Sequence, residues 1–256
     1  MSIKFAIIAN PRTGSNHYVD LLNSHPSITC HREVFHPHAV YMNAGTRLDL
    51  LADRNEAPLL FLERLYGDSL SEACGFKIFA EHNDNVLRYV LTSSDIIKIV
   101  LYRSNYLAVF SSEKIAQMKQ SYVSLTESPA PIDADAYARI DLTEKVHFRV
   151  DEFVSRWQSY QNHYKDSLQV LNDSGQKYLL VTYEEFLNED IFRGVFSWLG
   201  LPQPPQLFSR TKKTNSTDIL SRFENSEDVL GFLDRIGRLS WACESFILWD
   251  GKDSLS

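Results

Sequence analysis

A short turn near the N-terminus carries residue types that could bind an anion. The segment Asn10–Ser15 has the sequence NPRTGS and separates the apolar run Phe5–Ala9 from a helical pattern. The first amide N–H groups of a helix have no intrahelical partners, and the helix dipole adds positive character there. Arg12 adds a guanidinium that can bind two oxygens of one anion. These features predict a phosphate-type site, although an ordinary tight turn with an exposed arginine would have the same sequence.

The turn differs from a nucleoside-triphosphate loop. Such loops have the pattern G-x-x-x-x-G-K-[ST], in which a lysine directly follows the last glycine. Here Ser15 follows Gly14, and no lysine occurs between Lys4 and Lys77. The residue that would contact the terminal phosphates of ATP is therefore missing from the turn.

Titratable side chains follow two other predicted strands. Glu33 comes just after the predicted strand Ser27–His31, and His82 comes just after the predicted strand Cys74–Ala80. Ligands of open α/β sheets bind at the carboxyl edge of the strands, so either side chain could act as a general base. Glu33 could equally be a solvated turn residue paired with Arg32, and His82 could be a surface or capping histidine.

An arginine and a serine form a second candidate phosphate site. Arg103 ends the predicted strand Asp95–Tyr102, whose β-branched run is typical of a central parallel strand. A helix is predicted from Tyr106, and Ser111 lies on it eight residues after Arg103. This spacing lets both side chains reach one phosphate. Ser111 could instead be a buried serine that bonds to a carbonyl of its own helix.

The elements that would position these residues alternate between strand and helix. This alternation predicts an α/β fold, a three-layer α/β/α sandwich around a central parallel sheet. Further helical patterns cover 83–92, 150–172, 189–199 and 226–235, a region that leans helical covers 38–72, and a further strand covers 176–182. Residues 121–149 lack a regular period, apart from a weak alternation at Ile140, Leu142, Val146 and Phe148 that could form a short hairpin. We expect this loop to cover the acceptor side of one domain that spans 1–256.

Composition excludes several classes of protein. The chain has 256 residues, 44% of them hydrophobic, and a net charge of −7, a balance that argues against a nucleic-acid-binding domain. Its three cysteines are widely spaced and indicate neither a zinc site nor a disulfide framework. No stretch approaches the roughly 20 apolar residues of a membrane span, and no signal peptide is evident. A soluble cytoplasmic protein is the simplest expectation.

The first turn and the Arg103–Ser111 pair together resemble the PAPS-dependent sulfotransferases. Pro11–Asn16, followed by a helix that ends LLNSHP, resembles the 5′-phosphosulfate loop of that family, particularly of its bacterial carbohydrate and glycolipid members. The family also has a strand ending in arginine and a serine eight residues later, both on the 3′-phosphate of the nucleotide. The resemblance implies the sulfotransferase variant of the P-loop fold. It also implies sulfuryl transfer from 3′-phosphoadenosine 5′-phosphosulfate (PAPS) to a hydroxyl, without a metal.

The resemblance further implies which residues form the site. The donor would be held by Arg12, Thr13, Gly14, Ser15, Asn16, His17, Arg103, Ser111, Lys212 and Lys213. The last two lie in a basic segment that could equally be a solvated loop. Glu33 would be the first choice of base and His82 the second, with Arg12 and Lys77 as further catalytic residues. Lys77 and His82 are five residues apart here, whereas cytosolic members have the corresponding pair two apart, so this match is partial.

Two other functions fit the same sequence. One is a nucleotide-dependent small-molecule kinase of P-loop fold, against which stand the missing loop lysine and the lack of a clear magnesium-binding aspartate after a strand. The other is a non-catalytic nucleotide-binding protein, since a fold does not determine a function. The acceptor, whether carbohydrate, glycolipid or another small alcohol, and the oligomeric state have no signal in the sequence.

Overall fold

The computed structural model describes residues 2–118, 145–209, 211 and 216–244. The chain divides into two compact units, one formed by 1–102 with 166–211 and the other by 103–165 with 212–256. The expectation of a single sulfotransferase-like domain over 1–256 stays a prediction.

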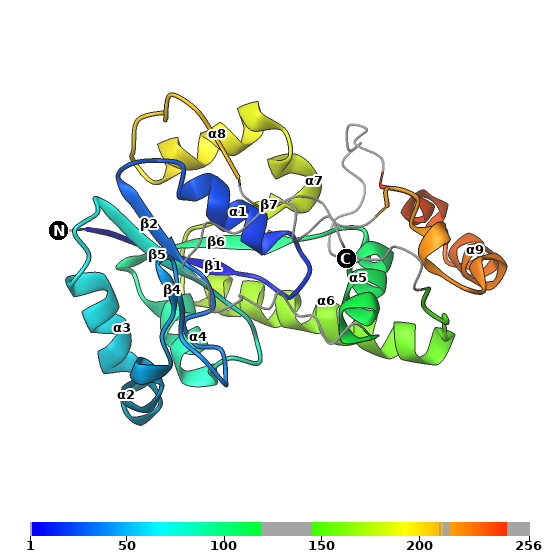
Figure 1. Cartoon of the computed structure of the whole chain (residues 1–256), viewed down its shortest axis with the longest axis horizontal. Coiled ribbons are helices and arrows are strands. Elements are labelled where there is room, and N and C mark those ends of the chain that lie inside the picture. Colours follow the sequence, from blue (N-terminus) through cyan, green and yellow to red (C-terminus); the bar gives the residue numbers. More distant parts are fainter. Residues whose placement is uncertain (1, 119–144, 210, 212–215, 245–256) are drawn as a thin grey trace. The chain divides into compact units, whose positions relative to one another are not determined.

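The first unit is built on a five-stranded parallel sheet with the strand order β2-β5-β1-β6-β7 (Figure 1). The strands are β1 (Ile3–Ile8), β2 (Ile28–His31), β5 (Ala73–Ile78), β6 (Ile96–Tyr102) and β7 (Tyr178–Thr182). Every pairing in this sheet is parallel. β1 lies in the middle, and β6 lies between β1 and β7, as its β-branched sequence predicted. The predicted α/β class with a central parallel sheet is confirmed.

Helices cover both faces of this sheet (Figure 1). On one face lie α1 (Ser15–Leu22), α7 (Tyr183–Phe186) and α8 (Glu189–Trp198). On the other lie α3 (Pro58–Gly67) and α4 (Asp84–Thr92), with α2 (Leu51–Glu56) next to α3. This is the layering that buries both faces of a parallel sheet.

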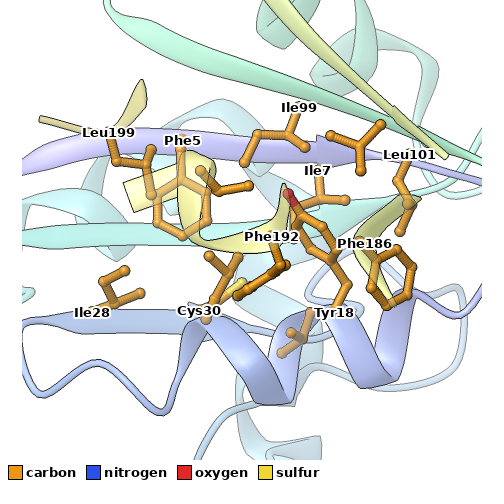
Figure 2. Packing of buried hydrophobic residues seen from close by; sticks show 14 of the residues in the cluster. Phe5, Ile7, Tyr18, Ile28, Cys30, Ile99, Leu101, Phe186, Phe192 and Leu199 are labelled. Carbon is orange, nitrogen blue, oxygen red and sulfur yellow. The ribbon is translucent and has the colours of Figure 1, made fainter. Parts of the chain in front are cut away.

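The core on the α1 face positions the first turn. Phe5 and Ile7 alternate onto this face of β1 and pack with Tyr18 of α1 and Phe186 of α7 (Figure 2). The rings of Tyr18 and Phe186 meet edge to face with centroids 5.1 Å apart. A Cβ at Gly75 of β5 would lie 2.3 Å from the ring of Phe5, so glycine is required at that point of the sheet.

Two predicted helical regions are shorter in the structure. α1 ends at Leu22 instead of reaching His25, whose ring Nδ1 accepts the amide N–H of Ser27 and so helps to turn the chain toward β2. Within 38–72, a small antiparallel hairpin, β3 (Tyr41–Met42) and β4 (Gly45–Thr46), precedes the helices. Gly45 has a φ of 130°, a value that non-glycine residues rarely adopt, which favours this turn over a helix.

The second unit contains α5 (Tyr106–Met118), the first part of α6 (Val150–Asp173) and α9 (Ser226–Arg235). Short 3-10 turns, η2 (Leu220–Arg222) and η3 (Leu239–Ala242), flank α9. An aromatic core around Phe148 and Phe153 holds these elements together. Val146 forms an isolated parallel bridge with Phe223. The suggested hairpin of Ile140, Leu142, Val146 and Phe148 lies partly outside the described residues and stays a prediction. Residues 119–144, including most of the predicted loop 121–149, lie outside the described residues.

Candidate functional site

The turn between β1 and α1 has a backbone suited to anions. Arg12 and Gly14 have φ angles of 64° and 83°, both left-handed, and flank Thr13. Thr13 is buried, and its Oγ1 donates to the Asn10 carbonyl oxygen at 2.7 Å. Left-handed residues in such turns aim successive N–H groups at one point. Holding the non-glycine Arg12 there costs about 1 kcal/mol or more, a strain typical of binding loops.

Gly14 is also constrained by its surroundings. A Cβ at this position would lie 2.5 Å from the Tyr183 ring and 3.1 Å from the Phe186 ring. The first residues of α7 therefore pack against the turn. The ring of Tyr183 leaves no room for a side chain at Gly14.

Lys77 supplies the turn with a cation from the neighbouring strand. In the parallel register of β1 and β5, Lys77 pairs with Ile7, and its side chain emerges on the same face of the sheet. The side chain is 1% exposed. Its Nζ lies 2.6 Å from Asn16 Oδ1 and 3.4 Å from Ser15 Oγ. β5 thus places a buried lysine beside a turn that has no lysine of its own.

Glu33, which follows β2, binds the same lysine. Lys77 Nζ lies 2.8 Å from Glu33 Oε1, and the Glu33 side chain keeps 23% of its surface exposed. Burial alone would raise the pKa of this carboxyl, but the nearby Lys77, with His82 as a smaller contributor, lowers it below its ordinary value. Burial lowers the pKa of Lys77, against the opposing attraction of Glu33. Glu33 is therefore an ionised, solvent-reachable carboxylate beside the anion turn.

Arg32 is not the partner of Glu33. Its Nη2 lies 2.9 Å from Asp20 Oδ1, on α1. The alternative of a solvated turn glutamate paired with Arg32 is therefore wrong. The sheet register decides this pairing, since it brings β5 and its buried lysine next to β2.

His82 joins the cluster through a tight turn after β5. Its Nδ1 accepts the amide N–H of Phe79 at 3.3 Å, which leaves its proton on Nε2, 3.7 Å from Glu33 Oε2. Burial, against the opposing attraction of Glu33, lowers the pKa of His82 to about 4. At neutral pH the ring is uncharged and presents a donor, so it is poorly suited to remove a proton.

A buried arginine fixes the turn that follows Glu33. Arg54 of α2 donates through Nη1 to the carbonyl oxygens of Val34 and His36, at 2.9 and 2.8 Å. No candidate site residue was predicted in this region, which was expected only to lean helical. A lone arginine on an otherwise unremarkable helix was the available signal, but its partners come from the tertiary fold.

Arg103 and Ser111 belong to one buried cluster in the second unit. Arg103 Nη2 lies 2.8 Å from Glu244 Oε1, and Arg222 Nη2 lies 2.6 Å from the same oxygen. Arg222 Nη1 donates to Ser111 Oγ at 3.0 Å. The side chains of the three charged residues are 4 to 8% exposed. The two residues of the predicted 3′-phosphate motif are thus joined through Arg222 and Glu244, neither of which the sequence identified.

Local contacts hold this cluster in place. The Tyr160 hydroxyl accepts the Arg103 amide N–H at 2.9 Å and donates to the Arg103 carbonyl at 3.0 Å. Asn105 caps α5 by accepting the amide N–H of Ala108 at 3.2 Å. Ser111 Oγ also donates to the Ala108 carbonyl at 3.3 Å, so the suggested bond to its own helix coexists with the bond from Arg222.

The chain returns to α1 of the first unit just before the basic segment. His17 Nδ1 lies 2.7 Å from Ser209 Oγ, and Thr211 Oγ1 donates to Asp20 Oδ2 at 2.6 Å. Lys212 and Lys213 lie outside the described residues.

In the described part of the chain, no group of three or more histidine, cysteine, aspartate or glutamate side chains is arranged to hold a metal ion. Among helices built from described residues, none is both long and apolar enough to cross a membrane.

Comparisons with known proteins give little further support. No family model matches the chain, and no curated protein matches it. Among solved structures, a sulfotransferase from Alicyclobacillus acidocaldarius is similar over 94% of this chain and 95% of that one, with 15% identity and a TM-score of 0.44. A likeness at this level carries no argument about function, so function is inferred from the side chains.

Proposed function

We propose that the chain is a sulfotransferase that moves a sulfuryl group from PAPS to a hydroxyl of a small acceptor, such as a carbohydrate, a glycolipid or another alcohol. The observation that carries the proposal is the Lys77 contact set. One buried lysine joins the anion turn, through Ser15 and Asn16, to the ionised carboxylate of Glu33. An anion site and a candidate base are thereby adjacent, which group transfer to a hydroxyl requires.

The turn would hold the 5′-phosphosulfate of the donor. Its amide groups, with the side chains of Arg12, Thr13 and Ser15, would stabilise the charge that grows on the departing phosphate. Asn10 supports this role, because its buried Nδ2 has no hydrogen-bond partner among the described residues. A buried donor without a partner costs about 1 to 3 kcal/mol, which a phosphate oxygen would offset.

Glu33 would act as the base. In the step we propose, the acceptor oxygen forms a bond to sulfur while the bond from sulfur to the 5′-phosphate oxygen breaks, and the hydroxyl proton passes to Glu33. Lys77 would keep Glu33 ionised and lend positive charge to the turn. His82, uncharged and with its proton on Nε2, would orient the carboxylate instead of removing the proton.

Arg103 and Ser111 would bind the 3′-phosphate. Their cluster offers guanidinium and hydroxyl donors on a buried, pre-positioned framework, which is the chemistry that selects a phosphate ester. This assignment comes from the sequence motif. The link between the two residues, from Ser111 to Arg222 and through Glu244 to Arg103, supports it.

Transfer assays with labelled donors test the proposal. Sulfur-labelled PAPS and γ-labelled ATP with magnesium would each be incubated with the protein and a panel of hydroxylated sugars, glycolipids and simple alcohols. We expect labelled product from PAPS alone. Transfer from ATP would favour the kinase, and nucleotide binding without transfer to any acceptor would favour a non-catalytic binding protein.

A further inference from the structure

Glu244 lies in a cluster whose other members suit a phosphate. Its Oε1 accepts from Arg103 at 2.8 Å and from Arg222 at 2.6 Å, and Arg222 also contacts Ser111. Two guanidinium groups that converge on one oxygen form a donor set that suits a phosphate ester, and Ser111 holds one of them through Arg222 Nη1. The carboxylate oxygen of Glu244 thus lies where a phosphate oxygen would receive the same bonds.

The charges favour replacement of the carboxylate. Glu244 brings one negative charge to the two arginines, whereas a phosphate monoester carries about 1.5 to 2 at neutral pH. With both anions present, the carboxylate would repel the phosphate inside a site that excludes most solvent, where like charges interact strongly. The phosphate and the carboxylate therefore compete for the same donors.

The backbone around Glu244 can stay in place during this exchange. The Glu244 amide N–H donates to the Thr217 carbonyl at 2.8 Å, and the Ile219 N–H donates to the Ala242 carbonyl at 3.0 Å. These bonds anchor the segment, so rotation of the Glu244 side chain alone would break its contacts with both guanidiniums. Arg222 keeps its hydrogen bonds to Ser111 and to the Ser216 carbonyl.

We propose that Glu244 is an internal competitor of the nucleotide, whose carboxylate holds Arg103 and Arg222 until a 3′-phosphate displaces it. This inference rests on the proposed function. It adds Arg222 to the site and makes Glu244 a brake on donor affinity. The brake also keeps the arginines ordered and paired before the nucleotide arrives.

Calorimetric titration of Glu244→Gln tests the competition. We expect this variant to bind adenosine 3′,5′-bisphosphate about tenfold or more tighter than the wild type, because removing one like charge in a partly desolvated site has an effect of this order. Affinity for adenosine 5′-monophosphate, which lacks the 3′-phosphate, stays unchanged. Glu227→Gln, at an exposed glutamate of α9, makes the same change in net charge and should bind both nucleotides like the wild type. Equal or weaker binding of the bisphosphate by Glu244→Gln would overturn the proposal.

Thermal unfolding keeps the test decisive if Glu244→Gln is poorly stable. Loss of the carboxylate leaves two guanidiniums without this counter-charge, so we expect a lower midpoint in the absence of ligand. Saturating adenosine 3′,5′-bisphosphate should then raise the midpoint of Glu244→Gln by more than that of the wild type. An equal shift in both proteins would show that the nucleotide and Glu244 do not share a site.

Two further outcomes separate this inference from the proposed function. If the wild type requires the 3′-phosphate but Glu244→Gln binds no differently, the proposed function stands and the inference fails. If neither protein distinguishes the bisphosphate from the monophosphate, the proposed donor site fails. In that case, thermal unfolding with inorganic phosphate tests the competition alone. If phosphate raises the midpoint of Glu244→Gln but not that of the wild type, competition between Glu244 and a phosphate is supported. If phosphate raises neither midpoint, the inference fails.

Discussion

The two clusters of charged residues differ in their balance of charge. The first, in the sheet unit, pairs one carboxylate, Glu33, with one buried lysine and a neutral histidine. The second directs Arg103 and Arg222 at a single oxygen of Glu244. A matched pair keeps a carboxylate ionised and suits proton transfer, whereas a cluster rich in guanidiniums suits the binding of an anion. Changes in the first cluster should therefore alter turnover, and changes in the second should alter nucleotide affinity.

The largest effect is expected from Glu33→Gln. Removing the base should lower turnover by about 10² to 10⁴, the usual contribution of general base catalysis. Affinity for adenosine 3′,5′-bisphosphate should stay within about threefold of the wild type, since the turn and the arginine cluster are unchanged. Steady-state kinetics with the best acceptor from the panel, together with calorimetry, measure both quantities.

Glu63→Gln provides the matched control, because Glu63 is an exposed glutamate on α3 of the same unit. It should leave both turnover and affinity unchanged. If Glu33→Gln turns over as fast as Glu63→Gln, the base lies elsewhere.

His82 should make stability depend on pH. Its pKa falls from an ordinary 6.5 to about 4 on folding, so the unfolded chain binds more protons between these values. The contribution of His82 to the free energy of unfolding is then fully present above pH 6.5. It is lost as the pH drops toward 4, by about 3 kcal/mol in all. His82→Gln should flatten part of this slope in urea unfolding measured between pH 7 and about 4. Burial also lowers the pKa of His31 to about 4, so His31 would still contribute to the slope in this variant.

His147→Gln is the control for this experiment, because His147 is 64% exposed. It should leave the slope nearly as in the wild type. If His82→Gln also keeps the wild-type slope, His82 is not a neutral, buried ring in the folded protein.

Gly14→Ala should destabilise the first unit more than Gly175→Ala. Both glycines have left-handed φ angles, 83° and 65°, so each substitution carries a strain of about 1 kcal/mol. Only at Gly14 would the new Cβ meet a ring, that of Tyr183 at 2.5 Å, whereas nothing lies within 4 Å at Gly175. We expect a further loss of about 1 to 3 kcal/mol for Gly14→Ala, from overpacking. Equal unfolding free energies would mean that the turn is not packed as described.

Lys77→Met should shift the pH dependence of turnover. Lys77 holds the pKa of Glu33 low against the opposing effect of burial, so its loss lets that pKa rise. The acid limb of the rate profile should therefore move to higher pH. Lys177→Met, at an exposed position next to β7, should leave the limb in place. If the acid limb does not move in Lys77→Met, Glu33 is not the group whose titration produces that limb.

Local patterns in the sequence were enough to predict most of the helices and strands, and two residues of the first cluster, Glu33 and His82. The β-branched run before Arg103 predicted an interior strand, and 226–235 matches α9 at both ends. Glu33 and His82 were predicted because each lies just after a predicted strand, where parallel sheets place their ligands. Lys77 was predicted only through the resemblance to the sulfotransferases. The choice of Lys77 over Arg32 as the partner of Glu33 needed the strand order, which no local pattern contains.

The second cluster was harder to predict because its members are far apart in the chain. Arg222 contacts Ser111 across 111 positions, and Glu244 lies in an irregular segment after η3. Neither belongs to a motif or a periodic pattern, so their partners are decided by tertiary packing alone. The same holds for Arg54, because its hydrogen bonds to carbonyl oxygens cannot be predicted from the residue pattern of its own helix.

Calorimetric titration with three nucleotides would test whether the protein binds the PAPS nucleotide through its 3′-phosphate. The wild type and Arg103→Ala would be titrated with adenosine 3′,5′-bisphosphate, adenosine 5′-monophosphate and ATP without magnesium. We expect the bisphosphate to bind the wild type at least about 100-fold tighter than the monophosphate does. Arg103→Ala should remove most of this difference, as loss of a charged bidentate contact would. A preference for ATP, or equal affinity for the bisphosphate and the monophosphate, would contradict a PAPS-dependent sulfotransferase.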